Sequence, residues 1–243
     1  MRAIFDLDKK LDYYTEEAMN GFRINLSFCG QDKKVILLTS YDEGEGKSST
    51  CMNLAKTEAL NGKKTLLIDA DMRKSVLAGG MDIQTDGQAT YGLSHYLSGQ
   101  VGMEKIFCKT NIDALDLIFA GPVPPNPSGL LDNEEFQHLL AVARREYELV
   151  IVDCPPLGKV IDAAVVAKYA DGAIMLVEVC EDSYHALVDM KKQIELSGCE
   201  ILGVVLNKMP KQGTSYYKKY YGGYYSKYGK YGKYGKEYGS YGK

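Results

Sequence analysis

Residues 40–49 combine small, basic and hydroxyl side chains in an order suited to binding a phosphate group. The run reads S-Y-D-E-G-E-G-K-S-S and lies between an apolar stretch and a helix-length stretch. Gly44 and Gly46 let consecutive backbone N–H groups approach an anion closely. Lys47 adds positive charge, and the Ser48 hydroxyl can hold Mg²⁺. A complete G-x-x-x-x-G-K-[ST] motif would begin with glycine where this chain has tyrosine, so the motif needs support from elsewhere in the chain.

Two acidic segments supply that support. Residues 66–73 read L-L-I-D-A-D-M-R and place Asp69 and Asp71 after an apolar run. Residues 149–156 read L-V-I-V-D-C-P-P and place Asp153 after another. Carboxylates at strand ends beside a phosphate loop are where phosphoryl transfer needs Mg²⁺ ligands and a general base. Any one of these aspartates could instead cap a helix, but the three together favour a nucleotide site.

The elements that would position these side chains alternate between two patterns. Short runs that are apolar on both faces predict buried parallel strands at residues 35–39, 65–68, 115–119, 149–152, 173–179 and 201–206. Stretches with helical patterning predict helices at residues 47–60, 133–145, 162–169 and 183–196. This alternation predicts an α/β fold with a doubly wound, mostly parallel sheet and with ligands beyond the carboxyl ends of its strands. Four prolines predict an irregular, rigid loop over residues 121–129.

The size of the chain fits one domain followed by a tail. Its 243 residues are 45% hydrophobic, which is enough for one packed core. We predict a domain over residues 1–210, with a helical segment over 1–30, and a flexible tail over 211–243. No apolar run approaches the roughly 18 residues of a membrane span, so we expect a cytoplasmic protein. The six cysteines lie far apart without metal-ligand spacing, and we expect them to be buried, reduced thiols.

Four motifs together resemble those of a known family. G-E-G-K-S, I-D-A-D-M-R, V-D-C-P-P and G-P-x-P-P-N-P-S are similar to motifs of the bacterial tyrosine kinases, or BY-kinases, that accompany capsule and exopolysaccharide synthesis. The resemblance covers nearly the whole chain. It implies a P-loop NTPase fold of the deviant Walker type and the use of ATP and Mg²⁺. It also implies an enzyme that phosphorylates its own tyrosines and regulates polysaccharide synthesis.

The resemblance implies roles for individual residues. The nucleotide would contact Gly44, Glu45, Gly46, Lys47, Ser48, Ser49, Arg73 and Asn207, of which Asn207 would read the adenine. Mg²⁺ would be held by Ser48, by Asp153 and, through water, by Asp71. The catalytic residues would be Lys47, Asp69 and Asp71. A tyrosine hydroxyl has a pKa of about 10, so a carboxylate must accept its proton, and Asp69 is the candidate base. Arg73 would stabilise its loop or the phosphate, or else form a surface ion pair.

The last part of the chain consists almost entirely of tyrosine, glycine and lysine. Eleven of the 19 tyrosines lie there, namely Tyr216, Tyr217, Tyr220, Tyr221, Tyr224, Tyr225, Tyr228, Tyr231, Tyr234, Tyr238 and Tyr241. A segment without aliphatic residues cannot offset the entropy of ordering, so we expect disorder. Because the resembled family carries such a cluster, we interpret these tyrosines as phosphoacceptors, modified in trans between subunits. A second interpretation is that the tail binds single-stranded nucleic acid, or promotes condensation, without any need for ATP.

Charge is distributed unevenly along the chain. Residues 208–243 carry nine lysines and one glutamate, a net charge of +8, whereas the whole chain has a formal charge of −3. Residues 1–207 therefore carry a charge of −11, and the two parts should attract each other. Each phosphate adds about −1.5 to −2 charges, so about five phosphates would cancel the charge of the tail. Our hypothesis is that the unmodified tail docks on a neighbouring subunit and that the phosphorylated tail is released.

The resemblance implies partners as well. In the family, a helix of the form E-x-x-R-x-x-R helps to close a ring. Here Glu17 and Arg23 keep the outer positions, Asn20 replaces the middle arginine, and Gly21 weakens the helix by about 1 kcal/mol. We therefore expect weakened ring assembly. A transmembrane adaptor of the polysaccharide co-polymerase type would activate the kinase and recruit it to the inner face of the plasma membrane. A tyrosine phosphatase and protein substrates are also expected.

The rival enzyme class consists of nucleotide-switched ATPases that share the deviant P-loop sheet but have no kinase activity. Those proteins carry K-G-G-x-G-K-[ST], in which a lysine five positions before the P-loop lysine neutralises phosphate across a dimer interface. In this chain that position is Asp42. A negative charge cannot neutralise a phosphate, so the sequence favours the kinase.

Overall fold

The described part of the chain contains nine strands, which form one sheet. The computed structural model describes residues 2–5, 11–30, 32–77, 83–85, 91–179 and 183–209. The strands are β1 (Arg2–Phe5), β2 (Val35–Ser40), β3 (Thr65–Asp69), β4 (Ile83–Thr85), β5 (Cys108–Thr110), β6 (Leu115–Ile118), β7 (Leu149–Asp153), β8 (Gly172–Glu178) and β9 (Ile201–Asn207). The helices are α1 (Tyr13–Ser27), α2 (Lys47–Leu60), α4 (Leu93–Leu97), α5 (Pro127–Leu131), α6 (Glu134–Glu146), α7 (Asp162–Ala167), α8 (Ser183–Ser197) and the 3₁₀ helix η1 (Met103–Lys105).

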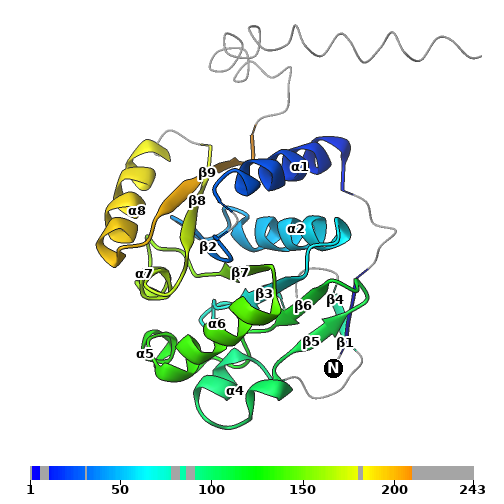
Figure 1. Ribbon diagram of the computed structural model, residues 1–243. Coiled ribbons are helices and arrows are strands. Elements are labelled where there is room, and N and C mark those ends of the chain that lie inside the picture. The colour runs from blue at the N-terminus through cyan, green and yellow to red at the C-terminus, as the bar shows by residue number, and fades with distance from the viewer. Residues whose placement is uncertain are drawn as a thin grey trace, which may run out of the picture. The chain divides into compact units, whose positions relative to one another are not determined.

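The strand order is β4-β1-β5-β6-β3-β7-β2-β8-β9 (Figure 1). The last six strands of this order are parallel to one another. By contrast, β4 pairs antiparallel with β1, and β5 pairs antiparallel with β6. β1 and β5 also pair parallel, but the six contiguous parallel strands are the six that the apolar runs predicted, so the mostly parallel α/β sheet is confirmed. Such runs identify these strands because a parallel sheet is buried on both faces.

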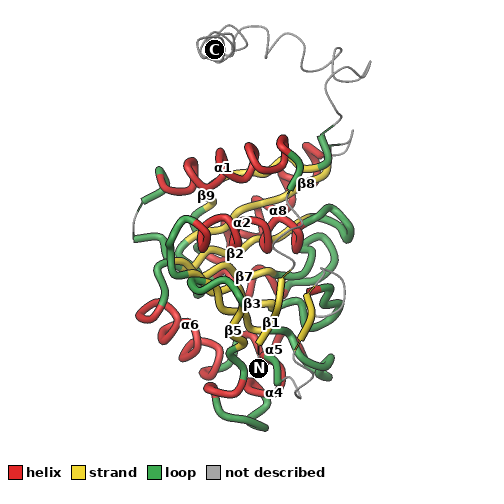
Figure 2. Tube along the Cα trace, turned by 90° about the vertical axis from the view of Figure 1, so that its right-hand side faces the viewer, coloured by secondary structure: helices red, strands yellow, loops and turns green. Residues whose placement is uncertain are grey.

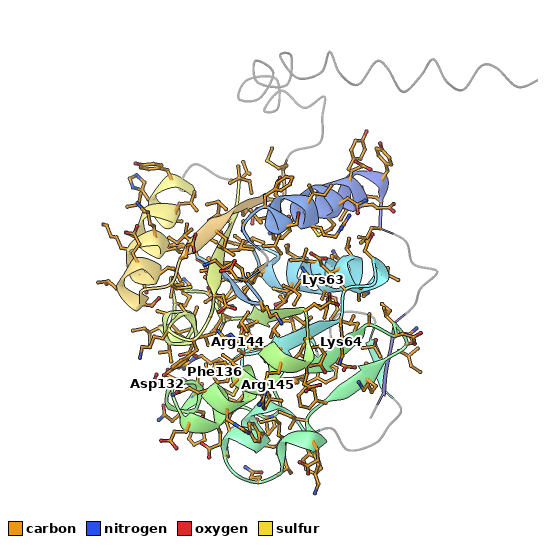
Figure 3. The ribbon with its side chains drawn as sticks, in the orientation of Figure 1. Lys63, Lys64, Asp132, Phe136, Arg144 and Arg145 are labelled. Carbon is orange, nitrogen blue, oxygen red and sulfur yellow. The ribbon has the colours of Figure 1, made fainter. Side chains whose placement is uncertain are left out.

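Helices cover both faces of the sheet (Figures 1 and 2). Successive residues of a strand point to opposite faces, so Leu66 joins one buried cluster while Leu67 joins the other. The first cluster includes side chains of α6, α7 and α8, among them the fully buried Phe136 (Figure 3). The second includes side chains of α2 and α1, and α1 packs against α2. Because β2, β3 and β7 are buried throughout, a ligand has access only beyond their ends.

Strand register brings the phosphate-binding run and the acidic segments together. Asp69 and Asp153 are register partners at the carboxyl ends of β3 and β7. On the other side of β7, Leu38 of β2 pairs with Asp153. The loop that follows β2 contains Gly44 and Gly46 and leads directly into α2. One edge of the sheet therefore carries all three motifs.

The prediction of an irregular loop over residues 121–129 is wrong at its end, because α5 begins at Pro127. Proline is compatible with the first position of a helix, where its missing N–H would have had no intrahelical partner. Asn126 caps the helix, since its Oδ1 atom accepts a hydrogen bond from Gly129 N at 3.1 Å. The last part of the proline-rich segment is thus a short helix.

The N-terminal segment is only partly helical. Helix α1 spans Tyr13–Ser27, with Asp12 as its cap, but Arg2–Phe5 form a strand that pairs with β4 and β5. A strand this short carries too little periodicity to be recognised without its partners. Within α1, Met19 is buried, and the helix packs against α2.

Three further expectations concern the cysteines, the membrane and the tail. Cys51, Cys108, Cys154 and Cys199 are buried, but Cys29 is only partly buried, and Cys180 lies outside the described residues. None of the helices that the structure describes combines the length and the apolar character that crossing a membrane requires. The boundary predicted at residue 210 and the tail tyrosines lie outside the described residues.

Candidate nucleotide site

The loop between β2 and α2 has the backbone shape of an anion cradle. Gly44 and Gly46 have φ values of 77° and 91°, in the left-handed region that favours glycine. Gly46 is the N-cap of α2, which begins at Lys47, and the described residues provide no side-chain hydrogen bond that caps this helix. The first N–H groups of a helix have no intrahelical partners and carry partial positive charge. The start of α2 therefore offers backbone N–H donors to a phosphate group.

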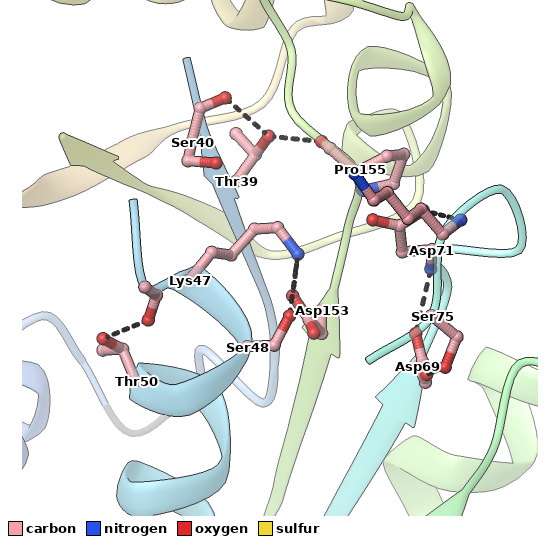
Figure 4. Close-up of polar contacts among 12 residues, drawn as sticks. Thr39, Ser40, Lys47, Ser48, Thr50, Asp69, Asp71, Ser75, Asp153 and Pro155 are labelled. Carbon is pink, nitrogen blue, oxygen red and sulfur yellow. Dashed lines mark hydrogen bonds and ion pairs between the residues drawn. The ribbon is translucent and has the colours of Figure 1, made fainter. Parts of the chain in front are cut away.

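Lys47 and Asp153 form a buried ion pair beside this loop. The Nζ atom of Lys47 contacts Oδ1 of Asp153 and lies 3.2 Å from Oγ of Ser48 (Figure 4). Burial by itself would lower the pKa of Lys47, but the charge of Asp153 outweighs it and holds the pKa above the ordinary value. Lys47 therefore stays protonated and can exchange a carboxylate for a phosphate.

The oxygen atoms near Lys47 fit a Mg²⁺ ion. Oδ2 of Asp153 is buried and accepts no hydrogen bond within the described residues. Ser48 and Asp71 line the adjacent pocket. In the part of the chain that the structure describes, no three His, Cys, Asp or Glu side chains converge as a complete metal cage. Mg²⁺ is commonly held by one or two carboxylates together with substrate phosphates and water, so this small set of hard oxygen ligands suits it.

Asp69 lies under the loop that carries Asp71. It is 1% exposed, and its Oδ1 atom accepts a hydrogen bond from Asp71 N at 3.1 Å. Ser75 Oγ donates to its Oδ2 atom at 2.5 Å. Burial, followed by the negative charge of Asp153, raises the pKa of Asp69 to about 8. A carboxylate with a pKa near the working pH is an effective proton acceptor, although Asp69 does not itself line the pocket.

A pocket of about 470 Å³ opens above these residues. Its walls contain residues 44–49 and Arg73, which were predicted to bind the nucleotide, and Asp71, which was predicted to hold Mg²⁺ through water. At its rim, Asp42 pairs with Lys159 at 3.3 Å, and Glu43 pairs with Lys74 at 2.5 Å. Asp42, which stands where the rival ATPases have lysine, thus forms an ion pair within its own chain.

Comparison with known proteins identifies the family. A family model described as AAA domain matches residues 33–198. The tyrosine-protein kinase CpsD of Streptococcus agalactiae serotype Ia is 40% identical over 202 residues, which cover 83% of this chain and 86% of that protein. The chain belongs to the bacterial tyrosine kinase family. Membership favours the kinase over the nucleotide-switched ATPase.

Solved structures agree with the sequence comparison. The kinase domain of the Escherichia coli tyrosine kinase ETK aligns with a TM-score of 0.75 and 29% identity, covering 82% of this kinase and 78% of that chain. The septum site-determining protein MinD of Pyrococcus horikoshii aligns with a TM-score of 0.61 and 20% identity, covering 74% and 72%. The latter likeness concerns the fold alone. The predicted P-loop type of sheet is thereby confirmed.

Arg73 is engaged in a network that the motifs of the kinase did not indicate. Its Nε and Nη2 atoms donate to the two carboxylate oxygens of Asp162 at 2.8 and 3.1 Å. Nη2 also donates to Ser128 Oγ at 3.0 Å, and Ser128 Oγ donates to Asp162 at 2.5 Å. Of the alternatives open for Arg73, these contacts favour stabilisation of its loop. Asp162 is fully buried, and its only sequence signal was its place at the start of a predicted helix.

Asn207 does not line the pocket of the kinase. Its Nδ2 atom donates to the carbonyl oxygen of Glu45 at 2.8 Å, so its amide group is directed at the phosphate loop. The expected contact between Asn207 and adenine stays a prediction. The Glu45 side chain also points into the protein, where its carboxylate accepts backbone hydrogen bonds.

Proposed function

We propose that this kinase transfers the γ-phosphoryl group of ATP to tyrosines of the tail of a neighbouring subunit. The observation that carries the proposal is the convergence of three motifs on one edge of the sheet. The uncapped start of α2, the Lys47 ammonium and the carboxylates that end β3 and β7 meet beside one pocket. These are the parts that phosphoryl transfer requires.

Each side chain has a distinct role in this proposal. The backbone N–H groups of residues 44–49 bind the phosphates, and Lys47 leaves Asp153 to neutralise them. Ser48, Asp153 and, through water, Asp71 would hold Mg²⁺, which when bound neutralises charge that develops on the phosphate oxygens. Among the residues that the structure describes, none donates a hydrogen bond to Oδ2 of Asp153, so this atom is available to the ion.

Asp69 is the proposed base. As the phenol oxygen of a tail tyrosine forms its bond to the γ-phosphorus, the bond to the bridging oxygen of ADP breaks, and the phenol proton passes to Asp69. The carboxylate must first exchange its hydrogen bond with Ser75 for one with the phenol. Asp69 is well suited to accept this proton because its pKa lies closer to that of the phenol than the pKa of an exposed aspartate does.

Family membership and the distribution of charge support proposals about the partners and the location of this kinase. We propose self-association, activation by a transmembrane adaptor of the polysaccharide co-polymerase type, and recruitment to the inner face of the plasma membrane. A role in capsular or exopolysaccharide synthesis and reversal by a tyrosine phosphatase belong to the same proposal. The opposite net charges of residues 1–207 and 208–243 support docking of the tail on a subunit.

The decisive experiment separates the enzyme from the acceptor. A full-length chain with phenylalanine at all eleven tail tyrosines is mixed, in Mg-ATP, with a full-length Lys47→Met chain. Mass spectrometry then maps phosphotyrosine. Phosphate on the tail of the Lys47→Met chain supports transfer between subunits. Hydrolysis of ATP without any phosphotyrosine, in these chains or in the unmodified protein with its adaptor, would instead support the nucleotide-switched ATPase.

The proposed release of the modified tail has its own test. Association of isolated tail peptides with the full-length kinase is measured at low salt, with either five or no tyrosines phosphorylated. The phosphorylated peptide should bind more weakly because its charge has been cancelled. Equal binding of the two peptides would refute the release.

A further inference from the structure

The side chain of Glu45 closes the phosphate loop on itself. Its Oε2 atom accepts hydrogen bonds from the backbone N–H groups of Tyr41 at 2.8 Å and Asp42 at 2.9 Å. These two residues begin the loop, and Glu45 lies near its end. Glu45 is 8% exposed, so its carboxylate is almost entirely withdrawn from solvent. The side chain therefore links the two ends of the loop through hydrogen bonds.

The same carboxylate ties the loop to the sheet. Its other oxygen, Oε1, accepts a hydrogen bond from the backbone N–H of Glu178, the last residue of β8, at 3.1 Å. Three backbone donors from two segments thus share one carboxylate. Hydrogen bonds to a charged acceptor are stronger than neutral ones, and a buried donor that loses its acceptor is costly.

Asn207 adds a second tie from the next strand. It is the last residue of β9 and the register partner of Glu178, and its Nδ2 atom donates to the carbonyl oxygen of Glu45 at 2.8 Å. A Cβ atom at Gly46 would lie 2.2 Å from Nδ2 of Asn207. The close approach of this amide is therefore possible only beside glycine.

Burying a carboxylate next to a phosphate site is electrostatically unfavourable for an anionic ligand. A glutamate at this place must therefore contribute in another way. The geometry points to positioning: we propose that Glu45 and Asn207 are positioning residues that hold the phosphate loop in its anion-binding shape by tying it to the ends of β8 and β9. This inference rests on the proposed binding of ATP at the loop.

The test compares two probes on the full-length kinase. Isothermal titration calorimetry measures binding of Mg-ATP and of Mg-tripolyphosphate, which has no adenine. The variants are Glu45→Gln, Asn207→Ala and the control Glu58→Gln, which removes a buried carboxylate from the opposite end of α2. Glu45→Gln should weaken both probes by a similar factor, of about tenfold or more, and the control should bind as the wild type does.

The tripolyphosphate probe separates positioning from adenine recognition. If Asn207 holds the loop, Asn207→Ala weakens both probes. If Asn207 only reads the base, the variant weakens ATP alone, and its assignment as a positioning residue is overturned. If the wild-type protein binds neither probe, both the proposed function and this inference are refuted. A wild type that binds both while Glu45→Gln binds equally well would overturn the inference alone.

Hydrogen exchange distinguishes a local effect from general destabilisation. In Glu45→Gln, exchange should accelerate at residues 41–46 and at Glu178, whereas the β7 segment should keep its wild-type rate. Acceleration throughout the sheet would overturn the positioning role. Should Glu45→Gln not fold, Glu45→Asp provides a second variant that keeps the charge. Its side chain is one methylene shorter and cannot reach both Tyr41 and Glu178, so it should also weaken both probes.

Discussion

Lys47 and Asp153 stand 106 residues apart in the sequence and form an ion pair in which Lys47 is 7% and Asp153 is 1% exposed. Substitution of a P-loop lysine is the obvious way to inactivate this kinase. Because the lysine also neutralises a buried carboxylate, its removal affects folding as well as ligand binding.

We predict that Lys47→Met lowers the free energy of unfolding by about 3–5 kcal/mol, because it leaves the buried charge of Asp153 without a partner. Urea unfolding of the ligand-free protein measures the change. The double variant Lys47→Met/Asp153→Asn should regain most of the loss, although it stays inactive. Lys168→Met, which breaks an ion pair exposed on both sides, should change stability by less than about 1 kcal/mol. A Lys47→Met protein as stable as the wild type would contradict the prediction.

Arg73 gives a second prediction. Its guanidinium donates two roughly parallel hydrogen bonds to the fully buried Asp162, which a lysine ammonium cannot reproduce. Arg73→Lys should therefore destabilise the protein by about 1.5–3 kcal/mol in urea unfolding. The exposed Arg145 of α6 provides the control, since Arg145→Lys should change stability by about 0.5 kcal/mol or less (Figure 3). If Arg73→Lys and Arg145→Lys change the free energy of unfolding equally, the bidentate contact between Arg73 and Asp162 is refuted.

Tyr147 gives a third prediction, which also concerns modification. Its hydroxyl donates to Oδ2 of Asp116 at 2.6 Å, and Asp116 is 4% exposed. Burial and the charge of Asp116 raise the pKa of Tyr147. Tyr147→Phe should cost about 1.5–3 kcal/mol in urea unfolding because a buried carboxylate loses a donor. Tyr184 is 72% exposed, and Tyr184→Phe should be nearly neutral.

The burial of Tyr147 also predicts that mass spectrometry finds no phosphate on it in the folded kinase. A phosphorylated Tyr147, or a Tyr147→Phe protein with wild-type stability, would show that the hydroxyl is not held by Asp116. The Tyr184→Phe control separates this effect from a general consequence of losing a tyrosine hydroxyl.

Asp171 gives a prediction on pH. It accepts hydrogen bonds from the backbone N–H groups of Lys34 and Val35 and from Arg144 Nη2 at 3.0, 2.7 and 2.9 Å. Burial alone would raise the pKa of Asp171, but the hydrogen bonds from Arg144 and the two backbone groups outweigh it and lower the pKa. Because the pKa of Asp171 is lowered in the folded state, its ionised carboxylate stabilises the protein at pH values above about 3.9, the pKa of an aspartate in the unfolded chain. This stabilisation is lost as pH falls through the folded-state pKa.

Asp171→Asn should therefore be less stable than the wild type at pH 7, and the difference should shrink as pH falls below about 4. Urea unfolding between pH 3 and pH 7 measures it. The control is Asp132→Asn, which removes a carboxylate whose partner Lys168 is exposed. Its difference in stability from the wild type should change less with pH than that of Asp171→Asn. A difference for Asp171→Asn that grows on acidification would have the wrong sign and would refute the prediction.

The sequence by itself determined the parallel sheet and the phosphate loop. Runs that are apolar on both faces identified the six contiguous parallel strands, because burial on both faces leaves a local signature. The spacing of Gly44, Gly46 and Lys47 identified the start of α2, because a cradle of consecutive N–H groups is built from contiguous residues. The short β1, β4 and β5 were missed because each depends on partner strands more than on its own pattern.

Only the tertiary structure decided what surrounds that loop. Glu45 reaches Glu178 across 133 positions, Asn207 reaches Glu45 across 162, and Arg73 reaches Asp162 across 89. No local pattern encodes such pairs, because each depends on which strands are neighbours and in what register they lie. The raised pKa of Asp69 has the same origin, since the burial and the adjacent Asp153 that cause it exist only once β3 and β7 pair.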